Sequence, residues 1–239
     1  MIQSPVAAPS RHTALSKEEF QDLKLLDSGS VATAIERFQV QLRSESYEET
    51  RLTCQYPHLL PVLGYAMTLK LRSSSPPDRG RNFFENTEWW SALLSLPAPR
   101  ILVLQDMDRH PGAGALIGET HACVLKTLDC VAVITNGAVR DIARIEGLDF
   151  QMFSTGLSLS HARSHVVHVG GPVQIGSLEI FPGDLLHGDG SGIVRIPREL
   201  AARIPATAAA LRRRDEALID YCHSPELSIE GLRDLLAGQ

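Results

Sequence analysis

The stretch CVAVITNGAVRDIARI (residues 130–145) joins an apolar run, a glycine turn and two adjacent opposite charges, Arg140 and Asp141. The run CVAVIT is rich in β-branched residues, which is typical of a buried strand. Asn136 and Gly137 indicate a turn after it, and IARI indicates a short helical segment. One interpretation of the charged pair is a solvated surface turn. The other is that Arg140 binds an anion while Asp141 holds a cation.

Strand and helix patterns alternate on both sides of this stretch. Strands are expected at 59–71, 100–106 and 130–135, followed by short strands between 151 and 196 that glycines and prolines separate. Ser16 and Glu19 form a capping-box pattern, which predicts a helix over 17–26. Further helices are expected at 30–39, after residue 87, and over 116–128, where Gly118 would open the helix.

The two ends of the chain have their own patterns. Residues 1–14 are expected to form a flexible arm. Pro197 is expected to begin a long final helix reaching about residue 221, since proline is tolerated at the first helical position, and a terminal helix follows. The alternation of elements predicts an α/β fold. We expect a single domain over 15–239, with its core at 59–197 and C-terminal helices at 198–237.

The composition excludes several classes of partner. The net charge of the 239 residues is −5, and no basic stripe indicates nucleic-acid binding. No run of about 18 apolar residues predicts a membrane span, and the first residues do not form a signal peptide. The four cysteines form no CxxC pair, which is typical of reduced thiols. We therefore expect a cytoplasmic protein.

Three other groups of residues could carry chemistry. His161 and His165 have a spacing that could share a metal on a helix, but their segment has the pattern of a loop and a strand. Asp106 and Asp108 follow a strand and could bind a cation, or simply lie in an exposed loop. Lys126 could form a Schiff base but is more typical of a surface lysine.

The spacing between Gly118-Glu119 and Arg140-Asp141 indicates a common site. Twenty residues separate Glu119 from Arg140, which fits a helix, a turn and a strand. Arg140 can therefore approach the N-terminus of the helix that Gly118 opens, where free N–H groups favour an anion. Its guanidinium matches a carboxylate. Asp141 could hold a divalent cation, since one carboxylate with water is typical of magnesium.

Several motifs then occur in a fixed order: GYAMT (64–68), GALIGETHA (114–122), VITNGAVRD (133–141), MFSTG (152–156), GPVQIGSLEIFPGD (171–184) and GDGSGIVRIP (188–197). By these motifs, the segment from Gly64 to Pro197 resembles the RraA-like family. That family includes 4-hydroxy-4-methyl-2-oxoglutarate/4-carboxy-4-hydroxy-2-oxoadipate aldolases and regulators of ribonuclease E activity. The resemblance implies a swivelling β/β/α-type domain with N-terminal and C-terminal helices. It also implies homotrimers or homohexamers with the site at a subunit boundary.

The resemblance also implies a site and a reaction. Arg140, with the helix start at Gly118 and Glu119 and the amides of Thr120 and His121, would bind the carboxylate of a pyruvate unit. Asp141 would hold Mg²⁺, Mn²⁺ or another divalent cation, which acts as a Lewis acid. A 4-hydroxy-2-oxo acid would be cleaved to pyruvate and a carbonyl product, with oxaloacetate decarboxylation as a side activity. We hypothesise that metal-bound water, oriented by Glu119, is the general base.

The chain departs from the family pattern near this site. Glu119 replaces an aspartate, Thr120 and His121 replace apolar residues, and Arg144 stands where an acid is common. These departures leave the natural substrate open. The alternative function is a non-catalytic regulatory protein that binds a ribonuclease or another protein.

Overall fold

The computed structural model describes residues 15–39, 44–46, 52–74, 84, 87–161 and 164–237. The arm expected at residues 1–14 lies outside the described residues. Within the described part of the chain, no helix is both long enough and apolar enough to cross a membrane.

Four parallel strands form the centre of the main sheet: β3 (Val62–Arg72), β4 (Arg100–Asp106), β6 (Cys130–Thr135) and β8 (Gln151–Ser154). Alternate side chains of β4 enter two different clusters, with Leu102 and Leu104 on one face and Ile101 and Val103 on the other. Burial on both faces explains why these strands are continuous apolar runs in the sequence.

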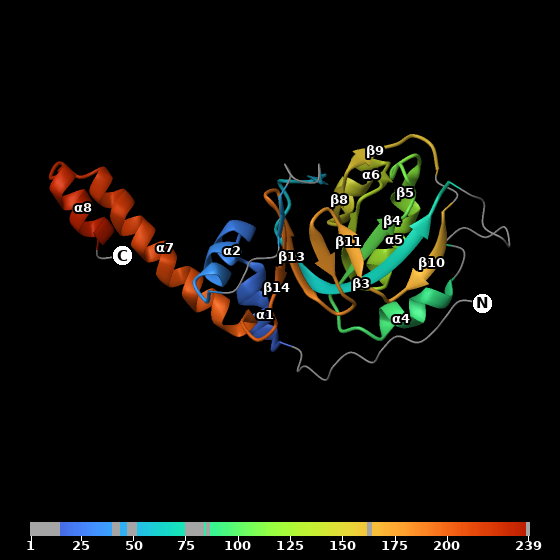
Figure 1. The fold of residues 1–239 in the computed structure, drawn as a ribbon, viewed down its shortest axis with the longest axis horizontal. Coiled ribbons are helices and arrows are strands. Elements are labelled where there is room, and N and C mark those ends of the chain that lie inside the picture. The colour runs from blue at the N-terminus through green and yellow to red at the C-terminus, as the bar shows by residue number, and fades with distance from the viewer. Residues whose placement is uncertain are drawn as a thin grey trace.

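Antiparallel strands extend this centre. β13 (Leu185–Asp189) pairs with β3 and continues to β14 (Gly192–Ile196) and β1 (Ser44–Ser46). β10 (His165–Val169) also pairs with β3, and β2 (Thr53–Cys54) pairs with β8. The nine strands curve into a nearly closed barrel (Figure 1). A separate hairpin consists of β11 (Val173–Ile175) and β12 (Leu178–Ile180).

The connections between the parallel strands contain short helices and a second, smaller sheet. The helical elements are η1 (Thr87–Trp89), α4 (Trp90–Leu94), α5 (Glu119–Thr127), α6 (Ile142–Ile145) and η2 (Glu146–Leu148). Apolar side chains of α4, α5 and α6 share one buried cluster with the sheet. The small sheet consists of β5 (Ala115–Ile117), β7 (Ala138–Val139) and β9 (Gly156–Leu157), all parallel.

Helices from both ends of the chain cover the β3–β13–β14 side of the barrel. They are α1 (Lys17–Lys24), α2 (Ser28–Glu36), η3 (Ala201–Arg203) and the start of α7 (Ile204–Cys222), which form a third cluster. α7 then runs away from the sheet, with α8 (Ile229–Ala237) beside its far end (Figure 1). The α/β fold with N-terminal and C-terminal helices is thus confirmed.

Two expected helix boundaries are wrong. Residues 116 and 117, expected in the helix, belong to strand β5 because their backbone pairs with β7, whereas Gly118 does cap the helix as expected. The final helix begins at Ile204 rather than at Pro197, since residues 198–200 form a turn. The proline in its first turn is Pro205, at a position where the missing N–H is tolerated.

Candidate functional site

The small parallel sheet brings the two predicted motifs together. β5 and β7 are neighbours, with Ala115 opposite Ala138 and Ile117 opposite Val139. The Arg140 N–H donates to the Ile117 carbonyl at 3.0 Å, so pairing continues to the point where both strands end. Gly118 and Arg140 therefore lie at the same sheet edge, as the twenty-residue spacing predicts.

The Asp141 carboxylate lies at the N-terminus of α5. Its Oδ2 accepts a hydrogen bond from the Glu119 backbone N–H at 3.1 Å and lies 3.3 Å from Arg140 Nε. Both charged side chains are 28% exposed, so the pair is accessible at the surface. Asp141 has a φ of 60°, a left-handed conformation that is uncommon for residues other than glycine. An unusual backbone conformation thus presents this carboxylate to the positive end of a helix dipole.

Gly118 makes this close approach possible. A Cβ at this position would lie 2.6 Å from Asp141 Oδ2 and 2.9 Å from Arg140 Nε. Both distances are shorter than van der Waals contact, so any side chain here would displace the two charged groups. The requirement for glycine comes from space, because Gly118 has an extended backbone that any residue adopts.

Glu119 pairs with Arg144 across the helix start. Glu119 Oε2 lies 3.2 Å from Arg144 Nη1, and the two side chains are 41% and 74% exposed. Arg144 was one of the departures from the family pattern, and so was Glu119. The structure shows that these departures contact each other: the longer acid reaches an arginine, whereas an acid at position 144 would repel it.

His121 caps the helix with its side chain. Its Nδ1 accepts a hydrogen bond from the Gly118 N–H at 3.2 Å, so the proton of the neutral ring is on Nε2. Burial lowers the pKa of His121 to about 4, with His161 and Arg140 adding to the effect, so the ring is neutral at pH 7. The Phe84 ring packs edge-on against it, with centroids 4.3 Å apart.

At the start of α5, the Glu119 N–H donates to Asp141, and the first amides are not used by the helix's own hydrogen bonds. The helix's own ladder begins with the Ala122 N–H donating to the Gly118 carbonyl at 3.0 Å. The preceding amides therefore face the N-terminal end of the helix. Thr120 is exposed in this first turn. The site thus combines a helix end, a guanidinium and two carboxylates.

The donor set suits only a lightly held cation. Among the described residues, no group of three His, Cys, Asp or Glu side chains could hold a metal ion. Asp141 uses Oδ2 for its two contacts, which leaves Oδ1 for a cation. Magnesium keeps several waters and often takes one or two protein carboxylates, so Asp141 would suit such an ion.

The other sequence candidates have structural roles in the described residues. The Asp106 carboxylate accepts hydrogen bonds from the Asp108 and Gly112 amides, both at 3.1 Å, and burial raises its pKa. Asp108 accepts from the Ser73 amide at 2.9 Å. Lys126 Nζ donates to the Leu148 carbonyl. His165 lies on strand β10, so the helical pairing with His161 does not form.

Asn136 is a positioning residue that the sequence reasoning missed. The Asp106 N–H donates to Asn136 Oδ1 at 2.7 Å, and Asn136 Nδ2 donates to the Asp106 carbonyl at 3.0 Å. This reciprocal pair ties the end of β4 to the loop that leads to Arg140. In the sequence, an asparagine between a buried strand and a glycine predicted only a turn, not this side-chain contact.

Comparison with known proteins identifies a family pattern over most of the chain. A family model described as RraA-like, Aldolase/RraA, matches residues 27–195. A Halalkalibacterium halodurans protein named "Putative 4-hydroxy-4-methyl-2-oxoglutarate aldolase" is 29% identical over 104 residues. The match covers 43% of this chain and 50% of that protein, so the chain spans half the length of this relative.

Solved structures share the fold at low sequence identity. An uncharacterized protein from Pseudomonas syringae pv. tomato superposes with a TM-score of 0.72 at 21% identity, covering 98% of this chain and 100% of that one. Streptomyces coelicolor RraAS2, described as an unusual member of the RNase ES inhibitor RraA protein family, superposes with a TM-score of 0.65 at 21% identity. This match covers 86% of this chain and 97% of that one.

Proposed function

Because the chain belongs to the RraA-like family, we propose that it is a divalent-metal-dependent carbon–carbon lyase acting on a 4-hydroxy-2-oxo acid. The family covers both aldolases and ribonuclease inhibitors. One observation supports an enzymatic function: the Asp141 carboxylate, the Arg140 guanidinium and the N-terminus of α5 meet at one exposed point. A helix end with an arginine suits a substrate carboxylate, and the neighbouring acid suits a cation.

Arg140 and α5 would bind the carboxylate of the pyruvate unit. Arg140 contacts Asp141 through Nε, so its two terminal nitrogens remain to form a two-point contact with a carboxylate. The helix end contributes amides and a positive dipole beside the same point. Together they fix the orientation of the 2-oxo acid.

Asp141 would hold magnesium or manganese through Oδ1, and such an ion supplies Lewis-acid stabilisation of charge that develops on the 2-oxo oxygen. The protein must also accept the proton of the 4-hydroxyl group when the bond between carbons 3 and 4 breaks. Glu119 lies at the same helix end and is partly exposed, so it can orient a water that takes this proton. Oxaloacetate loses carbon dioxide by cleavage of the same bond, which makes decarboxylation the expected side activity.

The deciding experiment measures pyruvate release from oxaloacetate and from 4-hydroxy-4-methyl-2-oxoglutarate, with magnesium and with excess chelator. Asp141→Ala should abolish release, while Asp215→Ala, an exposed acid on α7, should not change it. Release that persists in Asp141→Ala would remove this residue from the reaction. No release of pyruvate by the folded wild-type protein would favour the regulatory binding function instead.

The role of Glu119 needs a separate comparison. Glu119→Gln should lower turnover by about 10²-fold, the lower end of what general acid–base groups contribute. Arg144→Gln removes the same ion pair from the other side and should change turnover by less than about threefold, since exposed pairs contribute little. Equal losses of turnover in both variants would mean that catalysis depends on the ion pair and not on proton transfer through Glu119.

We also propose homotrimers or homohexamers with the site near a subunit boundary. The family resemblance supports this proposal. Sedimentation equilibrium of the purified protein tests it, and a monomer at micromolar concentration would contradict it.

A further inference from the structure

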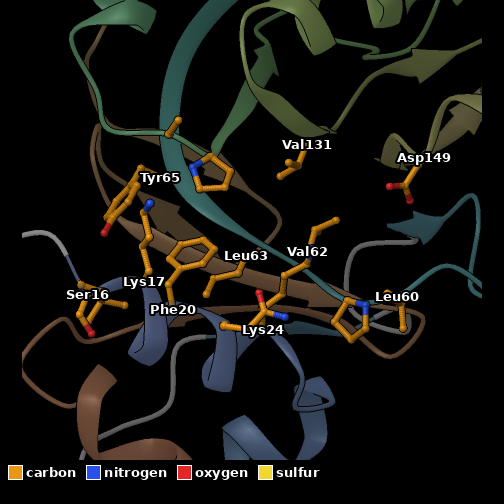
Figure 2. Close-up of a pocket in the computed structure, with 15 residues that line it drawn as sticks. Ser16, Lys17, Phe20, Lys24, Leu60, Val62, Leu63, Tyr65, Val131 and Asp149 are labelled. Atoms are coloured by element: carbon orange, nitrogen blue, oxygen red, sulfur yellow. The ribbon is translucent and has the colours of Figure 1, made fainter.

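A cavity of about 460 Å³ lies between α1 and the strands of the main sheet (Figure 2). Its lining includes residues next to the starts of the four parallel strands: Val62, Pro99, Val131 and Asp149. Arg140 and Asp141 follow β7 on the carboxyl side of the same β–α units. The cavity is therefore at the amino ends of the strands and is separate from the proposed lyase site.

One face of α1 forms a wall of this cavity. The lining residues Lys17, Phe20, Gln21 and Lys24 have the spacing i, i+3, i+4 and i+7, which places them on a single helix face. Figure 2 shows Lys17 and Phe20 extending from α1 toward the strand residues, and Lys24 lines the same cavity. Two of the four lysines in the chain thus border one cavity.

The capping box holds this face in place. The Glu19 N–H donates to Ser16 Oγ at 3.2 Å, and the Ser16 N–H donates to Glu19 Oε2 at 2.8 Å. The Glu19 carboxylate is therefore engaged by the helix start. It does not line the cavity, and Asp149 is the one acid among the lining residues.

The opposite wall is apolar. It consists of side chains from the segment before β3, from β3 itself and from β6, including Leu60, Val62, Leu63 and Val131. Leu63 and Tyr65 are almost fully buried, whereas Leu60 is 72% exposed at the surface. The exposed Leu60 side chain thus adds apolar surface at the edge of the cavity.

We propose that this cavity binds a small molecule with an apolar body and a carboxylate group. The volume lies within the range of about 300–1,000 Å³ that is typical of small-molecule sites. The apolar body would pack on Leu60, Val62 and Val131, and the carboxylate would face the ammonium groups of Lys17 and Lys24. The excess of two ammonium groups over one acid sets the sign of the ligand charge. This inference does not depend on the lyase reaction.

The test uses decanoate and decylammonium, which have matched chains and opposite charges. Isothermal titration calorimetry of the full chain below the micelle concentration should show one decanoate site per protomer and clearly weaker decylammonium binding. The Lys17→Gln/Lys24→Gln double variant should weaken decanoate binding by about tenfold, since each partly exposed charge contact contributes a few-fold. Lys70→Gln, near the carboxyl end of β3 and outside the cavity lining, should leave decanoate binding unchanged.

Two further variants distinguish the contribution of the lysine charges to ligand binding from that of the cavity shape. Lys17→Glu/Lys24→Glu should reverse the preference, so that decylammonium binds better than decanoate. Val131→Phe should fill the cavity and abolish binding of both probes, with folding checked by circular dichroism. Equal binding of the two probes by wild type, no binding at all, or an equal effect of Lys70→Gln would overturn the proposal.

Discussion

At the scale of single residues, Gly118 is the position in the proposed lyase site with the least space for a side chain. Gly118→Ala would place a Cβ 2.6 Å from Asp141 Oδ2, so the carboxylate must move away from α5. We expect a loss of pyruvate release of about 10²-fold, the effect of a displacement of about 1 Å in a catalytic constellation.

Gly147 provides the matched control for this variant. A Cβ there would meet no atom within 4 Å, so Gly147→Ala should retain full activity. Steady-state rates for both variants, with urea unfolding to verify stability, decide the question. Full activity of Gly118→Ala would mean that the position of Asp141 is not critical.

His121 makes stability depend on pH at the same site. Its pKa is about 4 in the folded protein against 6.5 ordinarily, so the unfolded chain binds a proton that the folded chain does not. Stability should therefore fall as pH decreases from about 6.5 to about 4, by an amount on the order of 1–3 kcal/mol. Burial also lowers the pKa of His187, so this residue also reduces the free energy of unfolding as pH decreases.

Urea unfolding between pH 4 and pH 7 checks this expectation. His121→Asn keeps an acceptor for the Gly118 amide but cannot titrate, so it should flatten part of the slope. His110→Asn, at an exposed position, should leave the slope unchanged. A wild-type slope that persists in His121→Asn would assign the pH dependence to other groups.

At the scale of elements, the capping box of α1 gives the clearest prediction. Ser16→Ala removes the acceptor for the Glu19 amide and should destabilise the protein by about 1 kcal/mol. Ser91→Ala, on the exposed face of α4, removes no described hydrogen bond and should be neutral or slightly stabilising. Urea midpoints of the two variants provide the measurement, and equal midpoints would show that α1 does not contribute to global stability.

The helices and strands also show which parts of the fold could be predicted from the sequence. Long apolar runs such as CVAVIT predicted β4 and β6 because strands buried on both faces need them. Strand β5 was missed because its three residues carry no period, and only pairing with β7 defines it. The start of α7 was misplaced because Pro197 and Pro205 are both acceptable first-turn prolines.

The candidate site was reachable only in part. The spacing predicted that Arg140 would approach Gly118, and the two do lie at the same sheet edge. The contacts of Glu119 with Arg144, and of the His121 ring with the Gly118 amide, depend on side-chain directions at a helix start. Spacing along the sequence does not determine these directions. The functional roles of these residues stay predictions.

At the scale of the whole molecule, the two proposed sites lie at opposite ends of the parallel strands. The cavity under α1 could not be predicted from sequence, because its walls come from five separate segments of the chain. If the sites are independent, Lys17→Gln/Lys24→Gln should change pyruvate release by less than about twofold, as surface substitutions away from a site usually do. A larger change in pyruvate release would show that the cavity under α1 is coupled to the proposed lyase site.

The position of the Asp141 carboxylate has a thermodynamic consequence. In the structure it acts as an internal counter-ion for the α5 amide and Arg140, the two groups that a substrate carboxylate would use. A cation that binds Asp141 weakens its hold on both groups and so releases them for an incoming anion. Cation and substrate would then bind with positive coupling, and because such coupling is reciprocal, each would raise the affinity of the other by the same factor.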